Sequence, residues 1–180
     1  MKKIILITGI HGVGKSYLCD KIKAMSDIPV YTASTLIKMH GVESDRQKRV
    51  ENAHDNQNLL KFSIENYIVD DFFILDGHTC LLDKNSAIED ISPSLEDLNI
   101  IGVISVVDKI LSIQEKLKLR DDLKLDIEFL KEFQARDSKS ACDYARKKNI
   151  PFIQVESDEI ESAFKFISAC AHKEFQDKKI

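Results

Sequence analysis

The stretch that decides the fold is residues 2–16, KKIILITGIHGVGKS. Residues 4–7 are apolar and largely β-branched, which predicts a central parallel strand over residues 2–8 that is buried on both faces. The glycine-rich segment 9–16 follows at once and matches the pattern GxxxxGK(S/T) without departure. Apolar residues then recur at helical spacing over residues 15–25. The stretch therefore predicts a strand, a glycine-rich turn and a helix.

The pattern in residues 9–16, called the P-loop below, is suited to binding a polyphosphate through the main chain. Consecutive N–H groups must turn inward around phosphate oxygens, and glycine tolerates that backbone and that close approach. The following helix adds its unpaired N–H groups and the positive end of its dipole. We predict ATP and Mg2+ as the ligands, with Lys15 bridging the β and γ phosphates and Ser16 binding the ion. The residues expected to contact the nucleotide are Gly9, His11, Gly12, Val13, Gly14, Lys15, Ser16 and Tyr17.

The rest of the chain alternates between short apolar segments and longer segments with helical periodicity. Residues 33–71 are interpreted as two helices, and residues 108–150 as two helices joined by a charged segment. This alternation is typical of an α/β domain with a parallel sheet, and a length of 180 residues predicts a single domain. Further strands are expected at residues 28–32, 72–75, 100–107 and 152–155.

Composition limits the partners and the compartment. The chain has 26 Lys and Arg against 30 Asp and Glu, a net charge of -4, so no overall positive field favours nucleic acid. The four cysteines are scattered without metal-ligand spacing, which indicates reduced thiols. The apolar run 4–7 is too short for a signal sequence or a membrane span. We expect a cytoplasmic protein without a membrane partner, and the oligomeric state stays open.

Two classes of triphosphate-using proteins are disfavoured. Hydrolytic switch proteins need DxxG and NKxD segments, and neither pattern occurs. Motor ATPases place a carboxylate pair at a strand end, but here Gly77 follows Asp76 where the second carboxylate would stand. If its strand neighbours the first one, Asp76 can order magnesium-bound waters or accept a hydroxyl proton; otherwise it caps its own turn. His78 is expected either to contact the acceptor or to bond the backbone beneath it.

Arginines are scarce, and phosphoryl transfer needs positive donors around the moving group. Arg120 precedes an acidic break between two expected helices, where we predict a short lid over about residues 119–127. Arg136 lies about four turns along the next helix, and both arginines are predicted to point at the phosphates when the lid closes. The alternative for each is a surface ion pair, for Arg136 with Glu132 or Asp137.

These residues together resemble the nucleoside monophosphate kinase family of P-loop kinases, and most of all archaeal-type adenylate kinases. The resemblance rests on residues 9–16 and, more weakly, on residues 31–38, residues 76–79 and the lid arginines. It implies an α/β fold in three layers, with a five-stranded parallel sheet of order 2-3-1-4-5 and a short lid. It also implies ATP on the P-loop and a monophosphate acceptor held by the helices of about residues 33–70.

Carried over by residue, the resemblance implies that Asp76 assists Mg2+ and the attacking phosphate. It puts Ser34, Thr35, Lys38 and His78 at the acceptor. The family's Asp-Gly-Phe-Pro-Arg segment is replaced here by DGHTC, so one acceptor-phosphate arginine is missing. The acceptor therefore stays open between a nucleoside monophosphate, AMP first, another small-molecule hydroxyl, and a nucleic-acid end bound by residues 46–49. A nucleotide-binding regulatory module with little turnover is the alternative to an enzyme. The residues predicted to act in catalysis are Lys15, Asp76, Arg120 and Arg136.

Overall fold

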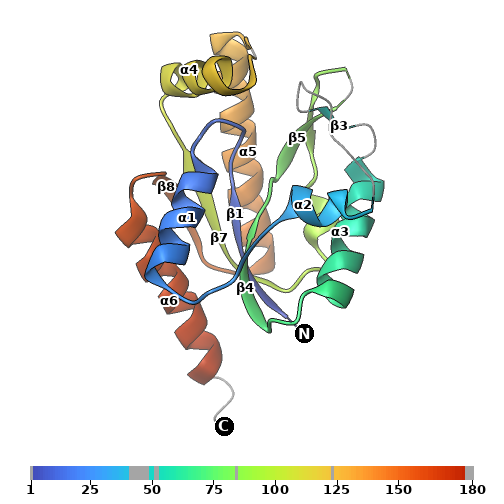
Figure 1. The fold of residues 1–180 in the computed structure, drawn as a ribbon, viewed down its shortest axis with the longest axis vertical. Coiled ribbons are helices and arrows are strands. Elements are labelled where there is room, and N and C mark those ends of the chain that lie inside the picture. The colour runs from blue at the N-terminus through green and yellow to red at the C-terminus, as the bar shows by residue number, and fades with distance from the viewer. Residues whose placement is uncertain (1, 41–48, 51–52, 84, 123, 177–180) are drawn as a thin grey trace.

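The computed structural model describes residues 2–40, 49–50, 53–83, 85–122 and 124–176. Its main sheet has five parallel strands in the order β2-β4-β1-β7-β8 (Figure 1). Numbered along the chain within this sheet, the order is 2-3-1-4-5, so the predicted α/β fold is confirmed. The strands are β1 (Lys3–Thr8), β2 (Val30–Thr32), β4 (Phe72–Asp76), β7 (Ile100–Val107) and β8 (Phe152–Glu156).

Helices cover both faces of this sheet, because alternate residues of its strands point to opposite sides. Ile5 packs in one buried cluster with Leu18, and Leu6 packs in the other with Leu60. Figure 1 shows α1 and α6 together on one side, α2 and α3 on the other, and α4 above the sheet. The helices are α1 (Lys15–Met25), α2 (Ala33–Lys38), α3 (Ala53–Tyr67), α4 (Ile110–Asp121), α5 (Ile127–Lys148) and α6 (Ile160–Gln176), with a 3-10 turn at Ser92–Leu95.

A second, three-stranded sheet was not predicted from the sequence. It consists of β3 (Arg49–Val50), β5 (Cys80–Asp83) and β6 (Ile88–Asp90). Strands of this length carry too few residues for a recognisable period-two pattern. The sheet packs beside α5, and its strand β5 follows β4 in the chain. It therefore sets the direction in which the segment after Asp76 runs.

The predicted helix pairs are present, and the structure defines where each helix begins and ends. In the first pair, α2 and α3 fall within the expected range, and residues 41–48 and 51–52 lie outside the described part of the chain. In the second pair, α5 begins at Ile127, because the Asp126 carboxylate accepts hydrogen bonds from the N–H groups of Glu128 and Phe129 at 2.9 and 3.1 Å.

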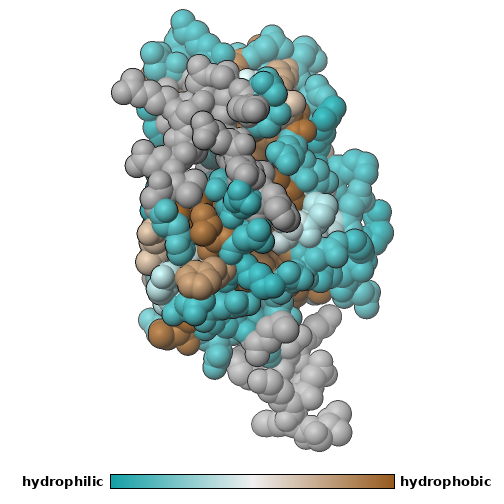
Figure 2. All heavy atoms as spheres, turned by 90° about the vertical axis from the view of Figure 1, so that its right-hand side faces the viewer, coloured by the Kyte–Doolittle hydropathy of each residue, from teal (hydrophilic) through white to brown (hydrophobic). Residues whose placement is uncertain are grey.

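The surface over α2 and α3 is mainly hydrophilic, with scattered hydrophobic side chains (Figure 2). Three of these are Met39, Phe62 and Tyr67, each about half exposed. Cys19, Cys80 and Cys170 are buried and Cys142 is half-buried, all as free thiols. None of the helices in the described residues is long and apolar enough to cross a membrane.

Candidate active site

The P-loop runs from β1 into α1 with a backbone that requires glycine at its two ends. Gly9 and Gly14 have φ values of 148° and 94°, which side-chain-bearing residues rarely adopt. A Cβ on Gly9 would lie 2.5 Å from the carbonyl oxygen of Val106, and one on Gly14 would lie 2.6 Å from the Ser157 Oγ. The loop is therefore held against β7 and the turn after β8, and its shape is fixed before any ligand binds.

The loop ends by exposing the start of α1. Gly14 is the N-cap residue, and within the described residues no side chain caps the helix and no acidic residue occupies its first turn. The first N–H groups of a helix have no partner inside the helix, and they carry the positive end of its dipole. This end of α1 is therefore suited to binding an anion.

A cavity of about 780 Å³, called the phosphate cavity below, opens at this point. Among the residues predicted to contact the nucleotide, Gly9 and Val13 do not line it: Val13 is buried in the core, and Gly9 is buried at the start of the loop, against Val106. The predicted residues that the structure brings together around it are His11, Gly12, Gly14, Lys15, Ser16, Tyr17, Ser34, Asp76, His78 and Arg120.

Lys15 folds back over the loop that carries it. Its Nζ donates to the carbonyl oxygen of Gly9 at 2.6 Å and reaches that of Ile10 at 3.4 Å. Burial lowers the pKa of Lys15, while the carboxylates of Asp76 and Asp137 act in the opposite direction. The buried ammonium gives the phosphate cavity a positive charge that an entering phosphate can neutralise.

Asp76 lies beside the P-loop. The sequence predicted this position for the case in which β4 is a neighbour of β1, and the two strands are paired. β4 pairs with β1 in parallel, with Asp76 opposite Ile7, so the carboxyl ends of both strands meet at one edge of the sheet. The residue is 8% exposed. Burial raises the pKa of Asp76, and the nearby Lys15 partly offsets this rise.

Ser16 and Asp76 offer one hydroxyl and one carboxylate to the phosphate cavity. These are hard oxygen ligands of the kind that Mg2+ prefers, and this ion keeps several waters and uses substrate phosphates as further ligands. Across the part of the chain that is described, no group of three or more His, Cys, Asp or Glu residues could hold a metal ion. The donor set therefore fits an ion that arrives with a nucleotide.

Asp137 is the main residue at the site whose position the sequence does not predict. The sequence offers it as a surface partner of Arg136, but it is 1% exposed, on the inner face of α5. Its Oδ1 accepts hydrogen bonds from the Oγ1 of Thr79 at 2.9 Å and from the N–H of Cys80 at 3.0 Å, and the Oγ1 of Thr8 lies 3.4 Å away. Burial raises the pKa of Asp137. The carboxyl group thus ties α5 to the strand end that leads into the P-loop.

The sequence carries a signal for this buried acid. Asp137 falls within an apolar stripe of α5 at helical spacing, between Phe133 and Ala141, both of which are buried. A carboxylate in such a stripe must be buried, and a buried carboxylate requires hydrogen-bond donors.

The two predicted lid arginines have different positions. Arg120, in the last turn of α4, lines the phosphate cavity and contributes to lowering the pKa of Lys15. Arg136 does not reach this cavity: its Nη2 pairs with the Oε1 of Glu132 at 2.6 Å, and its side chain is 56% exposed. The structure therefore shows the surface ion pair with Glu132 for Arg136, which lines a different cavity beside the small sheet, with Cys80 and Ile88.

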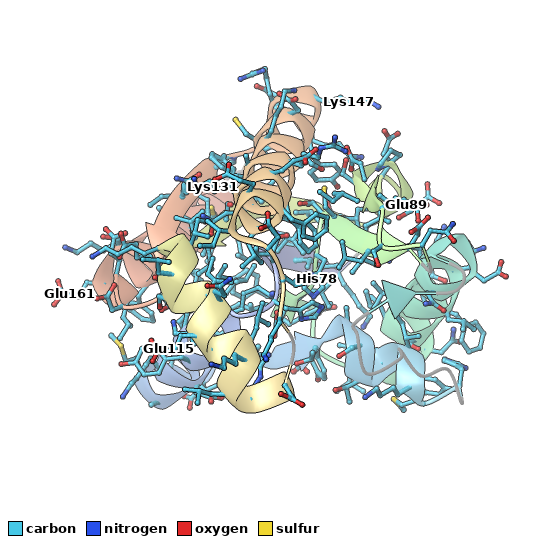
Figure 3. The ribbon with its side chains drawn as sticks, turned by 90° about the horizontal axis from the view of Figure 1, so that it is seen from above. His78, Glu89, Glu115, Lys131, Lys147 and Glu161 are labelled. Carbon is cyan, nitrogen blue, oxygen red and sulfur yellow. The ribbon has the colours of Figure 1, made fainter. Side chains whose placement is uncertain are left out.

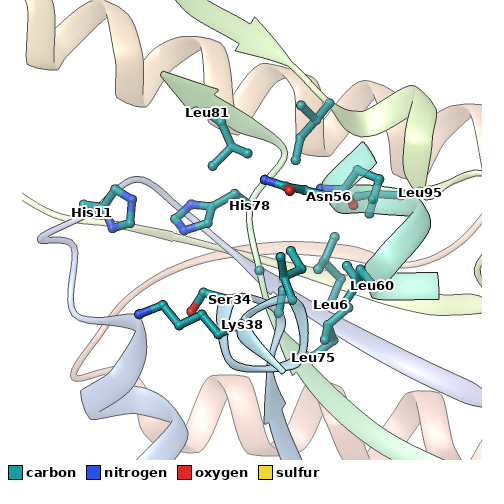
Figure 4. A pocket seen from close by; sticks show the side chains of 15 residues that line it. Leu6, His11, Ser34, Lys38, Asn56, Leu60, Leu75, His78, Leu81 and Leu95 are labelled. Carbon is teal, nitrogen blue, oxygen red and sulfur yellow. The ribbon is translucent and has the colours of Figure 1, made fainter. Parts of the chain in front are cut away.

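A second cavity of about 100 Å³, called the aliphatic cavity below, adjoins the first (Figure 4). His11, Ser34 and His78 line both cavities, and the His11 and His78 rings lie 4.6 Å apart between their centroids. Seen from above, His78 is near the middle of the molecule (Figure 3). The aliphatic residues of the lining are Leu6, Ala33, Ile37, Leu60, Leu75, Leu81, Ile91 and Leu95.

Of the predicted acceptor residues, Ser34, Lys38 and His78 line the aliphatic cavity, and Thr35 lines neither cavity. Thr35 is exposed on the outer side of α2. Two further residues of the lining, Asn56 and Gln57 on α3, were not predicted. They lie in a segment rich in charge and amide, where nothing in the sequence separates them from a solvated helix face.

Comparison with known proteins identifies the family. Residues 8–134, well over half of the chain, match the model described as "AAA domain". The chain belongs to this AAA domain family. Membership supports nucleotide binding by the P-loop of this AAA domain, whereas the finer resemblance to archaeal-type adenylate kinases stays a prediction.

A solved structure and the curated proteins complete the comparison. The structure of a gluconokinase from Sinorhizobium meliloti 1021 aligns over 97% of this chain and 97% of its own, with a TM-score of 0.55 and 12% identity. This likeness shows a shared fold. A search of the curated proteins found no match.

The different positions of the two arginines can be tested by substitution. Arg120→Ala should weaken binding of Mg2+-ATP by roughly 10-fold to 100-fold, because a charged donor at the cavity is lost. Arg136→Ala should leave the dissociation constant unchanged, since its side chain pairs with Glu132 and does not line the phosphate cavity. Isothermal titration calorimetry measures both. Equal losses in the two variants would contradict the placement.

The buried carboxyl of Asp76 predicts a pH dependence of stability in the absence of nucleotide. Because burial raises the pKa of Asp76 above its ordinary value of 3.8, the folded protein favours the protonated form. The stability gained from this proton is present at low pH and is lost as the pH rises through the folded-state pKa. Asp76→Asn should therefore unfold at a higher denaturant concentration than wild type at neutral pH. The difference should shrink as the pH falls toward the ordinary carboxyl value.

Asp20→Asn, a change at an exposed position of the same helix that carries Lys15, is the control and should unfold at the same denaturant concentration as wild type at neutral pH. A loss of stability in Asp76→Asn at neutral pH would show that this carboxylate is stabilised by its partners rather than penalised by burial.

Proposed function

We propose that the protein is a P-loop phosphotransferase that moves the γ-phosphoryl group of ATP to a small acceptor, and that the acceptor is a nucleoside monophosphate, with AMP as the first candidate. The observation that supports it is the contact between the two cavities, which share His11, Ser34 and His78. Direct transfer requires donor and acceptor to lie side by side in line. A hydrolytic module would have no use for a second, adjoining cavity.

The side chains at the phosphate cavity have distinct roles in this proposal. The N–H groups of the P-loop and of the α1 N-terminus hold the phosphates, and Lys15 exchanges its bond to the Gly9 carbonyl for one to a phosphate oxygen. Ser16 and Asp76 would hold Mg2+, which supplies positive charge to the phosphates when it is bound. Arg120 adds a donor for the charge on the transferred group.

Asp76 has a further role if the attacking group is a hydroxyl. Its raised pKa makes it a stronger base than an exposed carboxylate, so it can accept the proton that the hydroxyl loses. An acceptor phosphate already carries an ionised oxygen and needs no such base. The same residue then orients magnesium-bound water.

The lining of the aliphatic cavity favours a nucleobase over a polyol. A flat base buries apolar area against leucine side chains, while each hydroxyl of a sugar acid would need a hydrogen-bond partner there. Lys38 and Ser34, on α2, lie where an acceptor phosphate could bind. Among the described residues, no arginine lines this cavity. Lys38 is the cation of this lining and would pair with the acceptor phosphate.

We also propose that two segments of this single domain have separate roles. Residues 33–70 bind the acceptor, because α2 and α3 supply much of the aliphatic cavity. About residues 119–127 act as a lid, because α4 ends at Asp121 and its C-cap residue Asp122, two positions after Arg120, has the left-handed conformation with φ 50°. A short turn between two helices is a place where rotation can bring Arg120 onto the phosphates.

The central experiment measures ADP formation from ATP and Mg2+ with a panel of acceptors: the common nucleoside monophosphates, gluconate and an oligonucleotide with a 5′ hydroxyl. We expect a monophosphate to stimulate ADP formation strongly. Lys15→Ala should lower this rate by roughly 10²- to 10³-fold, because the ammonium stabilises charge that develops during transfer. Lys21→Ala on the exposed side of α1 should keep the rate.

Stimulation by gluconate or by the oligonucleotide alone would replace the monophosphate by that acceptor. Tight ATP binding with no product from any acceptor would overturn the proposal in favour of a regulatory module. Of the basic patch predicted for a nucleic-acid end, residues 46–49, only the backbone of Arg49 lies in the described chain.

A further inference from the structure

Asp137, on the inner face of α5, forms a hydrogen-bond network with two threonines, one next to the P-loop and one next to the aliphatic cavity. Its Oδ1 accepts from the Oγ1 of Thr79 at 2.9 Å, from the N–H of Cys80 at 3.0 Å and from the N–H of Thr79 at 3.3 Å. The Oγ1 of Thr8 accepts from the N–H of Thr79 at 2.9 Å and lies 3.4 Å from each carboxylate oxygen of Asp137. Thr8 and Thr79 are fully buried, as is Asp137, so the network joins its elements inside the protein.

This network continues the pairing of β1 with β4 beyond the end of the strands. The last residue pair of the ladder is Ile7 with Asp76, and the N–H of Gly77 donates to the carbonyl oxygen of Ile7 at 3.0 Å. From there the chain after β1 turns into the P-loop, and the chain after β4 runs on to β5. The bond from Thr79 to Thr8 connects the two chains where they separate, and α5 supports it from behind through its carboxylate.

The two chain segments that the network connects belong to the two cavities. Thr8 directly precedes Gly9, where the P-loop begins and whose carbonyl oxygen accepts from the Lys15 Nζ. Thr79 directly follows His78, which lines both cavities. A displacement of Thr79 against Thr8 would therefore move the lining of the aliphatic cavity relative to the P-loop.

A buried carboxylate on this face of α5 is unfavourable unless it is hydrogen-bonded. Its neighbours along the buried stripe are Phe133 and Ala141, and an apolar side chain at position 137 would be buried without losing hydration. What the carboxylate adds is direction, because a satisfied buried polar network specifies one arrangement of the elements that it connects. The geometry is thus suited to holding a defined separation between them.

We propose that Asp137 is a positioning residue for phosphoryl transfer, and that through Thr8 and Thr79 it sets the separation between the P-loop and the acceptor-side segment 77–79. The inference rests on the proposed function and adds a residue to it. Asp137 lines neither cavity, so it acts through the two threonines. Direct transfer needs both bound groups in line and close together, and an error of about 1 Å in their separation slows such a reaction by roughly 100-fold. Each cavity would still bind its own ligand.

Other polar residues of α5 attach the helix to β7 and its end. Gln134 bonds the main chain of Asp108 in both directions at 3.0 Å, and the Oγ of Ser138 lies 3.2 Å from that of Ser105. These contacts hold α5 on the sheet without reaching the segment that lines the aliphatic cavity. Those of Asp137 connect the P-loop side to the acceptor side.

The test compares turnover with binding in the full chain. With the monophosphate that stimulates ADP formation most, Asp137→Ala should lower kcat by roughly 10-fold to 100-fold. In calorimetry, Mg2+-ATP alone and the monophosphate alone should bind within about 3-fold of wild type, because each cavity keeps its own lining. Diadenosine pentaphosphate, which joins two adenosines through phosphates, should lose roughly 10-fold in affinity, since its binding depends on the separation of the cavities.

Two further variants separate hydrogen bonding from charge and from packing. Asp137→Asn keeps an oxygen that accepts from Thr79 and Cys80, so it should restore kcat to within about 3-fold of wild type. Phe133→Leu removes buried volume from the same face of α5 and leaves the network in place, so it should lower the denaturation midpoint with kcat unchanged. If Asp137→Ala does not fold, Thr79→Val takes its place; it removes one donor at nearly constant volume and should lower kcat several-fold.

Unchanged kcat in Asp137→Ala, or in Thr79→Val where that variant is used, would overturn the positioning role. So would an equal loss of kcat in Asp137→Asn or in Phe133→Leu, or a loss of ATP affinity as large as that of diadenosine pentaphosphate. In each of these cases the wild type is still stimulated by a monophosphate, and phosphotransfer stands. If no acceptor stimulates the wild type, the proposed function is wrong and the positioning role falls with it.

Discussion

The parallel pairing of β1 with β4 is the interaction on which the site depends. It places Asp76 opposite Ile7, two residues before the P-loop begins, and so brings the loop and the carboxylate to one edge of the sheet. A shift of this register by one residue would turn Asp76 to the other face of the sheet. The main-chain hydrogen bonds of a buried sheet therefore set the relative position of Lys15, Ser16 and Asp76 more firmly than any contact between their side chains.

The buried groups around the P-loop have opposite charges that partly offset one another. Lys15 is flanked by the carboxyl groups of Asp76 and Asp137, which act on its pKa in the direction opposite to burial. Burial raises the pKa of both carboxyl groups and lowers that of Lys15, so it disfavours the charged form of all three groups. The arrival of phosphates changes that balance most at Lys15, whose present partners are carbonyl oxygens.

The sequence predicted the parts of this molecule that local patterns encode. The apolar runs predicted the five main strands. The P-loop motif predicted the position of the phosphate cavity, and the place of Asp76 at the end of an apolar strand predicted that its carboxyl group lies there. Features that depend on the rotation of one element against another were missed or left open. The depth of Asp137 and the inward turn of Gln57 were missed, and Arg136 was left open between the phosphates and an ion pair with Glu132. The small sheet was missed because its strands are too short to show a period.

We propose that the P-loop main chain and Lys15 hold the phosphates of a nucleotide whose partner occupies the aliphatic cavity. A crystal structure with a bisubstrate analogue, in which two nucleosides are joined by phosphates, tests this arrangement. We expect phosphate oxygens within hydrogen-bond distance of the loop N–H groups, the Lys15 Nζ moved from the Gly9 carbonyl to a phosphate, and one base between α2 and α3. Phosphates bound elsewhere, with Lys15 still on the Gly9 carbonyl, would show that the proposal is wrong.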